Sequence, residues 1–140
     1  MNTSLSGACL CGHVRYTTSA TPVFSGNCHC RDCQRASGAA YAPTWLVPEQ
    51  AVTVSGAVKY HESRADSGNK VYRGFCPNCG SQLFGRLELM PGMLGIRAGS
   101  LDDPSAFAPA LDFYTASAAP WDHMNPALPK FAHAPVPNRA

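Results

Sequence analysis

The residues most able to do chemistry in this chain are its seven cysteines, which fall into three closely spaced groups. The groups are C-x-C at Cys9 and Cys11, C-x-C-x-x-C at Cys28, Cys30 and Cys33, and C-x-x-C at Cys76 and Cys79. Close spacing lets one tight turn present two thiolates to a metal at small entropic cost. An odd number of cysteines cannot all pair as intramolecular disulfides. The spacing therefore favours metal binding.

The third group is the strongest single signal for metal binding. It lies within Cys76-Pro77-Asn78-Cys79-Gly80, and the closing glycine can adopt positive φ. Backbone N–H groups of such a turn can point at the two sulfurs. The pattern predicts a metal knuckle in preference to a redox dithiol or a plain turn. A knuckle supplies two ligands, whereas a closed structural zinc site needs four.

The remaining two ligands can come from either of the other groups. In one arrangement the first group joins the third, which leaves the second group as a three-thiolate site. In the other, the last two cysteines of the second group form a zinc ribbon with the third group. The gap of 42 residues between them is well beyond the roughly 15–20 residues of that motif. The first arrangement also uses every cysteine, so we favour it.

A three-thiolate zinc site keeps a fourth position for water or substrate, as catalytic sites do. We therefore predict that Cys28, Cys30 and Cys33 hold a catalytic zinc. Three thiolates give that centre a net charge of −1, which makes it a poor Lewis acid and favours a soft incoming thiolate. Two alternatives remain open. His29 could close the cluster as a structural site, or Cys30 and Cys33 could act as a redox pair.

Short strands between turns must position these cysteines. Alternating or β-branched segments predict strands over residues 13–17, 22–27, 41–47, 51–55, 58–61, 70–75 and 82–87, with weaker candidates at 93–97 and 111–114. One short helix is expected from Arg31 to Ser37, with Gly38 as its stop. A hairpin is expected to turn at Ser55-Gly56. The chain therefore reads as mainly β.

Length and composition limit the remaining possibilities. The chain has 140 residues and 14.9 kDa, which suits one domain, and its formal charge of +2 gives no reason to expect a nucleic-acid or membrane partner. We find no signal-like start and no long apolar run, so we expect a cytoplasmic protein. Five prolines follow in the last 21 residues. We expect one domain over 1–140, with a core at about 5–123 and an extended Pro-rich tail at 124–140.

The ordered cysteine blocks resemble those of a known family. The segments GACLCGHVRY at 7–16, CHCRDCQRASG at 28–38 and RGFCPNCGSQL at 73–83 are similar to the signature blocks of the glutathione-dependent formaldehyde-activating enzyme (GFA) family, also called the CENP-V/GFA domain. The turn GSLDDP at 99–104 and Trp121 fit the later part of the family pattern. The resemblance covers about residues 5–123.

This resemblance implies a fold, two metals and an activity. The implied fold is a mainly β, Mss4-like β-tent with small sheets and short helical turns. Two Zn²⁺ per chain are implied: a structural one held by Cys9, Cys11, Cys76 and Cys79, and a catalytic one held by Cys28, Cys30 and Cys33. The implied activity is that of a carbon–sulfur lyase joining a thiol such as glutathione to a small aldehyde such as formaldehyde. A non-catalytic zinc-stabilised binding module and a redox-sensing zinc protein are the alternatives.

A glutathione site should present basic or amide donors to the two carboxylates of that thiol. Arg31 and Arg35, which flank Cys33, are the nearest candidates in sequence. Other basic candidates are Arg73, Arg86 and Arg97, and candidate pocket-lining residues are Tyr41, Thr44 and Trp45.

Overall fold

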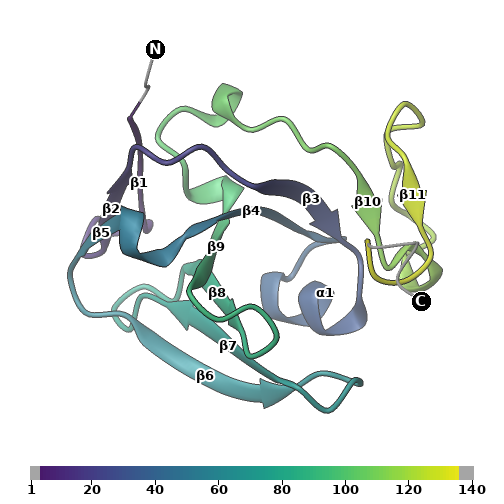
Figure 1. Ribbon diagram of the computed structural model, residues 1–140, viewed down its shortest axis with the longest axis horizontal. Helices are drawn as coiled ribbons and strands as arrows, with labels where there is room; N and C mark the ends of the chain where they lie inside the picture. The colour runs from purple at the N-terminus through teal and green to yellow at the C-terminus, as the bar shows by residue number, and fades with distance from the viewer. Residues whose placement is uncertain (1–3, 136–140) are drawn as a thin grey trace.

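The computed structural model describes residues 4–135, and β-strands make up most of its regular secondary structure (Figure 1). The smaller sheet has three strands in the order β1–β2–β5: β1 (Leu5–Ala8), β2 (Arg15–Thr18) and β5 (Val52–Ser55). The larger sheet has the order β11–β10–β3–β4–β9–β8–β7–β6: β3 (Phe24–Cys28), β4 (Ala42–Pro48), β6 (Lys59–Arg64), β7 (Lys70–Phe75), β8 (Gln82–Leu87), β9 (Met93–Arg97), β10 (Asp112–Phe113) and β11 (Lys130–Phe131). The predicted fold class, mainly β with small sheets, is confirmed.

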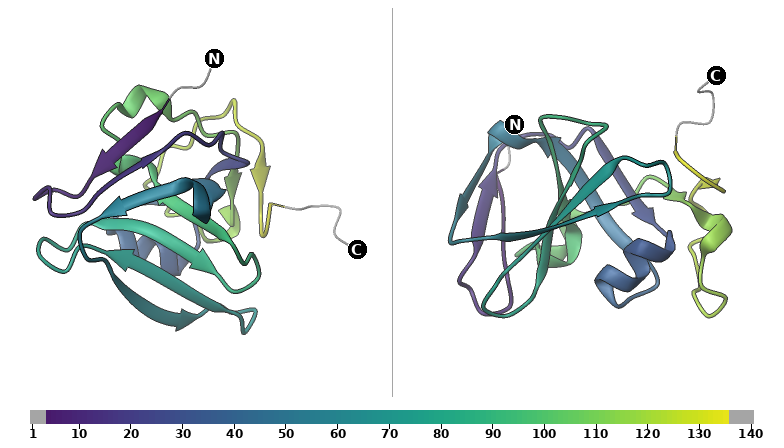
Figure 2. Two further views of the ribbon diagram at one scale, coloured as in Figure 1. Left: turned by 60° about the vertical axis from the view of Figure 1, so that its left-hand side comes forward. Right: turned by 90° about the horizontal axis from the view of Figure 1, so that it is seen from below.

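Most neighbouring strands are antiparallel, and β10 is the exception because it runs parallel to both β3 and β11. Two views in Figure 2 show the small sheet gathered at one end of the molecule, with the C-terminal strands at the other. In the middle of the large sheet, Gly85 pairs with Arg73 on one side and with Gly95 on the other. This row of cross-strand neighbours brings two glycines and an arginine together in the middle of the sheet.

The predicted strands are confirmed with bounds shifted by a few residues, but the predicted hairpin at Ser55-Gly56 is wrong. Strand β5 pairs with β2, and β6 pairs with β7, so the two strands lie in different sheets. Gly56 does make the turn, with φ of 89°. A Cβ there would lie 2.1 Å from the carbonyl oxygen of His13. The turn is therefore pressed against the loop before β2, and the chain passes from there into the large sheet.

The one α-helix among the described residues, α1 (Arg31–Ser37), has the predicted bounds and is capped at both ends. The N-cap is Cys30, whose Sγ accepts a hydrogen bond from the backbone N–H of Cys33. Gly38 ends the helix in the left-handed region with φ of 72°, as a C-terminal glycine does. Four short 3₁₀ turns complete the helical structure, at Glu49–Ala51, Ala98–Ser100, Pro104–Ala106 and Thr115–Ser117. Helix α1 thus fixes one cysteine by its cap and another by its first turn.

The main hydrophobic core lies where the two sheets face each other. Tyr16 of β2 and Phe84 of β8 are both buried and pack edge to face, with ring centroids 5.4 Å apart. Val14, Val47 and Ile96 are fully buried around them. A second, smaller cluster consists of the buried side chains of Cys28, Cys33 and Ala42. Among residues 4–135, no helix is long and apolar enough to span a bilayer.

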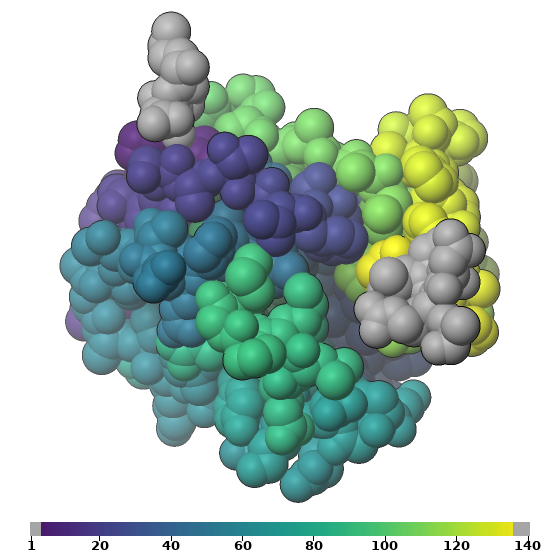
Figure 3. All heavy atoms as spheres, viewed as in Figure 1, coloured from purple at the N-terminus to yellow at the C-terminus, as the bar shows by residue number. Residues whose placement is uncertain are grey.

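The C-terminal part of the described chain packs on the edge of the large sheet. Strand β11 is its edge strand, and the residues around it form one flank of the surface, shown in yellow in Figure 3. Residues 136–140 of the predicted tail lie outside the described residues. The domain boundaries given above stay a prediction.

Candidate metal centres

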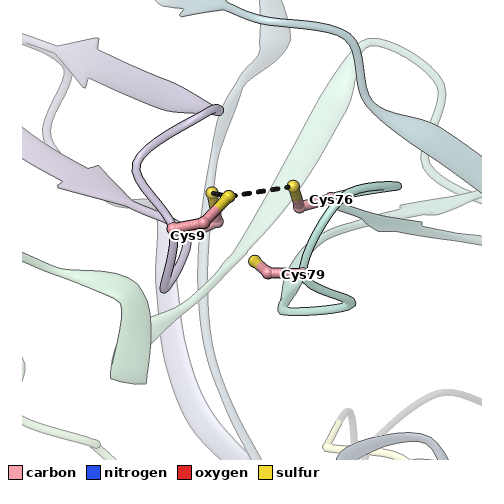
Figure 4. Close-up of side chains that lie close together, drawn as sticks. Cys9, Cys76 and Cys79 are labelled. Atoms are coloured by element: carbon pink, nitrogen blue, oxygen red, sulfur yellow. Dashed lines mark hydrogen bonds between the residues drawn. The ribbon is translucent and has the colours of Figure 1, made fainter.

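Four cysteines from two different sheets converge at the junction between those sheets. The loop between β1 and β2 carries Cys9 and Cys11, and the loop between β7 and β8 carries Cys76 and Cys79. Figure 4 shows the side chains of the three labelled cysteines pointing toward one another from these loops. All four Sγ atoms lie within 4.8 Å of one another. This is the four-cysteine centre.

The spacing of these sulfurs suits a tetrahedral metal. Sulfurs about 2.3 Å from a tetrahedral zinc ion lie about 3.8 Å from each other. The Sγ atoms of Cys9 and Cys11 are 3.7 Å apart, and those of Cys11 and Cys76 are 3.9 Å apart. Two of the sulfur–sulfur distances thus match the edge length of a zinc coordination tetrahedron, and all four sulfurs lie close enough together to hold a metal ion.

Hydrogen-bond donors surround the sulfurs of this centre. The backbone N–H of Val14 donates to Sγ of Cys9 at 3.2 Å, and Nδ2 of Asn78 donates to Sγ of Cys11 at 3.2 Å. The hydroxyl and backbone of Ser81 lower the pKa of the Cys79 thiol to about 5. Donors of this kind stabilise thiolates, which are the form that binds metal.

The second group of cysteines forms a separate three-cysteine centre. Cys28 ends β3, Cys30 caps α1 and Cys33 lies in the first turn of that helix. The Sγ atoms of Cys28 and Cys30 are 3.4 Å apart, and all three sulfurs lie within 4.8 Å of one another. The structure thus groups the cysteines as four and three. The zinc-ribbon alternative, which needs the second and third groups together, does not fit this arrangement.

The three thiols of this centre do not ionise equally. Hydrogen bonds from the thiols of Cys28 and Cys30 lower the pKa of Cys33, and the positive charges of Arg97 and Arg73 act in the same direction. The pKa of Cys28 is raised, first by its contacts with the other two thiols and then by burial. The positive charges of the two arginines therefore favour the thiolate form of Cys33.

His29 lies between two of these cysteines in sequence but does not face them. Its side chain is fully buried, with Nε2 at 2.9 Å from Oδ1 of Asp112 and Nδ1 at 3.6 Å from Oδ2 of Asp122. Oδ2 of Asp112 also contacts Nζ of Lys130 at 2.9 Å. Both ring nitrogens are therefore directed at carboxylates, so His29 does not close the three-cysteine centre as a fourth ligand.

Two arginines approach the three-cysteine centre from the large sheet. Nη2 of Arg73, on β7, lies 3.9 Å from Sγ of Cys33. Arg97, on β9, donates from Nη1 to Oγ1 of Thr44 at 3.0 Å, and its charge acts on the same thiol. Both arginines are among the basic candidates named from the sequence, but their closeness to Cys33 in space could not be derived from their positions in the chain. The signal that could have found Arg97 is the presence of glycines inside the neighbouring strands, because such glycines mark close approach.

The other sequence candidates lie elsewhere. Arg31 and Arg35 are exposed on α1, and Arg31 donates to Oε1 of Gln34. Arg86 pairs with Glu49 and lies over the ring of Tyr60, with its Cζ 4.4 Å from the centroid. A role of Arg31 and Arg35 in binding substrate stays a prediction.

Aromatic candidates divide between the core and the site. Trp45 is buried and packs against Phe107. Tyr41 packs against His29 and lines a cleft of about 290 Å³ formed with residues 27, 43, 98, 99, 104, 107 and 109. Tyr114, which the sequence did not single out, is the one non-glycine residue with positive φ among residues 4–135, at 55°. Burial, followed by the negative charges of the Cys28 and Cys30 thiolates, raises the pKa of Tyr114.

Comparisons with known proteins indicate the family of this chain. A family profile described as "Glutathione-dependent formaldehyde-activating enzyme" matches residues 4–117. A protein of Penicillium rubens named "Putative glutathione-dependent formaldehyde-activating enzyme" is 30% identical over 80 residues, which cover 57% of this chain and 41% of that protein. One of Aspergillus flavus with the same name is 29% identical over 83 residues, covering 58% and 43%. The region of this chain that matches covers less than half of the length of each of these relatives.

A solved structure shares the fold. A crystal structure of a Rhodobacter sphaeroides protein superposes with a TM-score of 0.58 over 90% of this chain and 98% of that one, at 16% identity. The profile covers most of the chain and includes all seven cysteines. The chain therefore belongs to the glutathione-dependent formaldehyde-activating enzyme family.

Proposed function

We propose that this protein is a zinc-dependent carbon–sulfur lyase that adds a thiol such as glutathione to a small aldehyde such as formaldehyde. The observation that carries the proposal is the number of ligands at the three-cysteine centre. Three sulfurs converge there, whereas a closed structural site has four. His29, the nearest candidate for a fourth ligand, is directed at Asp112 and Asp122.

The donor set of each centre fits zinc. Thiolates are soft ligands that select zinc over hard cations such as Mg²⁺ and Ca²⁺. All seven cysteines are free thiols, which suits a reducing compartment such as the cytoplasm. We assign a structural role to the four-cysteine centre, because its ligands come from both sheets and a metal there would tie them together.

The reaction needs a thiolate next to an electrophilic carbon. Zinc, when bound at the three-cysteine centre, would supply an open position for the substrate sulfur and lower the pKa of that thiol. The sulfur adds to the carbonyl carbon, the C=O π bond opens, and the oxygen takes up the proton that the thiol released. No oxidant or reductant is needed.

Residues of this chain position the reacting centre and offer a hydrogen-bond donor to the carbonyl oxygen. Cys28, Cys30 and Cys33 are fixed by a strand end and a helix cap, which pre-organises the centre. Tyr114 follows Phe113, which pairs with Cys28 across β10 and β3, so its hydroxyl is a candidate donor to the carbonyl oxygen as negative charge develops. The left-handed backbone at Tyr114 is the kind of strained conformation that proteins keep at functional sites.

The proposal is tested by measuring adduct formation by the zinc-loaded protein. Glutathione and formaldehyde are mixed with and without protein, and exchange between free aldehyde and S-hydroxymethylglutathione is followed by NMR, with S-methylglutathione as the control that has no thiol. We expect exchange faster than the spontaneous rate only with the free thiol. A protein that holds two zinc ions yet accelerates no member of a panel of thiols and aldehydes would be a binding module. Zinc release on mild oxidation with pairing of Cys30 and Cys33 would instead indicate a redox sensor.

A further inference from the structure

Two guanidinium groups lie beside the three-cysteine centre without a carboxylate partner. Arg73 is 3.9 Å from Sγ of Cys33, and the charge of Arg97 also acts on that thiol. Within residues 4–135, neither arginine takes part in an ion pair with an acidic side chain. Other arginines such as Arg15 and Arg86 do have such partners. The pair at the centre is therefore a concentration of positive charge that no carboxylate of the described chain offsets.

The position of Arg97 is built into the sheet by two glycines. Gly85 and Gly95 are cross-strand neighbours on β8 and β9. A Cβ at Gly85 would lie 3.2 Å from Nη2 of Arg97, and one at Gly95 would lie 3.8 Å from Nη1. The missing side chains leave a hollow in the sheet that receives the guanidinium. Thr44 then fixes it by accepting from Nη1 at 3.0 Å.

Arg73 is held on the other side of the same glycine. It is the cross-strand neighbour of Gly85 on β7, and its Nη1 donates to Oγ of Ser63 at 3.1 Å. Its Nε is buried and has no hydrogen-bond partner. An unpartnered buried donor costs free energy, so this N–H is available to a polar group of a ligand.

The electrostatics of the pair point to an anion. Arg73 and Arg97 both lie beside Gly85, so two positive charges are held close together, and like charges repel. A zinc ion with three protein thiolates and one substrate thiolate carries a formal charge of −2, which would repel an anionic group. The two guanidiniums balance that charge and offer a planar set of N–H donors that matches a carboxylate.

We propose that Arg73 and Arg97 form a carboxylate-binding subsite next to the three-cysteine centre. The subsite rests on the proposed function, because the carboxylate belongs to one of the two compounds that react there. It is either a carboxylate of the thiol or one borne by the carbonyl compound, as in a 2-oxo acid. The carboxylate does not react. It orients the compound while the S–C bond forms and the carbonyl oxygen is protonated.

Binding measurements that require no reaction test this subsite. In the first arm, calorimetry compares 3-mercaptopropionate with its neutral amide, 3-mercaptopropionamide, on the zinc-loaded protein. In the second arm, glyoxylate is compared with neutral glycolaldehyde in the presence of S-methylglutathione, which cannot add to a carbonyl. We expect the carboxylate to bind about tenfold to a hundredfold more tightly in one arm. The arm that shows the preference identifies which compound carries the carboxylate.

Variants then assign the preference to the two arginines. Arg73→Gln and Arg97→Gln should reduce the ratio of the charged probe's affinity to the neutral probe's affinity to near one. Arg97→Lys should leave an intermediate ratio, because the charge remains but the paired N–H donors are lost. Gly85→Ala should lower it with zinc content unchanged, since the added methyl group displaces the guanidinium of Arg97. Arg15→Gln, an exposed arginine paired with Asp102, is the matched control and should keep the full preference.

Two results would overturn the subsite. One is the absence of a preference in both arms with the unmodified protein. The other is a loss of affinity in Arg73→Gln and Arg97→Gln that is equal for charged and neutral probes, which would mean that the arginines only balance the charge of the metal centre. A preserved preference without any acceleration of adduct formation would contradict the proposed function and leave the subsite standing.

Discussion

Nε2 of His29 lies 2.9 Å from Oδ1 of Asp112, and both side chains are almost completely buried. His29 sits in the loop between Cys28 and Cys30, whereas Asp112 belongs to β10 near the C-terminal edge of the large sheet. This contact connects the loop of the three-cysteine centre to a strand more than 80 positions away in sequence. His29 therefore acts as an anchor for that loop.

Removal of the carboxylate should loosen this anchor. Asp112→Ala leaves His29 and the amide of Asn27 without their buried partner and also frees Lys130, so we expect the free energy of unfolding to fall by about 3 kcal/mol. The measurement is urea unfolding of the zinc-loaded protein. Glu62→Ala, which removes an exposed ion pair with Lys70, is the control and should cost at most about 1 kcal/mol. Equal losses in the two variants would argue against the anchor.

Ser81 should help the four-cysteine centre to keep its metal in mildly acidic solution. Its hydroxyl and backbone lower the pKa of Cys79 to about 5, so the thiolate persists in mildly acidic solution. Ser81→Ala removes the hydroxyl and raises that pKa, and protons then compete with the metal at higher pH. We expect the pH of half-maximal zinc release, followed with a chromophoric chelator between pH 4 and 7, to move upward. Ser67→Ala, in an exposed loop, should leave it in place, and an unchanged midpoint in Ser81→Ala would refute the assignment.

Tyr16 should make the fold sensitive to alkaline pH. Burial raises the pKa of Tyr16 to about 12, against a hydrogen bond with Ser100 that lowers it. Because the unfolded tyrosine ionises near pH 10, the folded state loses stability as the pH rises from about 10 to about 12, by roughly 2–3 kcal/mol in total. Below pH 10 this contribution is fully present. Urea unfolding at several pH values should show a shallower alkaline decline in Tyr16→Phe, and parallel curves for the two proteins would contradict the prediction.

Local signals in the sequence predicted the parts of the fold that local physics decides. Alternating patterns marked the strands of the large sheet except β11, which lies in the segment expected as an extended tail, and Gly38 marked the end of α1. The grouping of the cysteines also followed from spacing, since two thiolates in one tight turn can hardly be separated. β1 was missed because Leu5–Ala8 is short and rich in small residues, with no clear alternation.

Long-range relations could not be obtained in the same way. The hairpin at Ser55-Gly56 failed because turn chemistry identifies the turn but not the sheet that each flanking strand joins. The position of the Arg97 guanidinium depends on the space left by Gly85 and Gly95, which are cross-strand neighbours on β8 and β9. The anchor between His29 and Asp112 likewise depends on β10 lying parallel to β3. Each of these needs the tertiary structure.

We propose different roles for the two metal centres: the four-cysteine centre holds the sheets together, and the three-cysteine centre reacts. The most direct test is the rate of glutathione–formaldehyde adduct formation by Cys33→Ser, with zinc counted and unfolding measured in the same sample. We predict one zinc ion fewer per chain, a protein that still unfolds in a single cooperative transition with zinc bound at the four-cysteine centre, and a rate no faster than the spontaneous reaction. An undiminished rate after loss of zinc from the three-cysteine centre would contradict it.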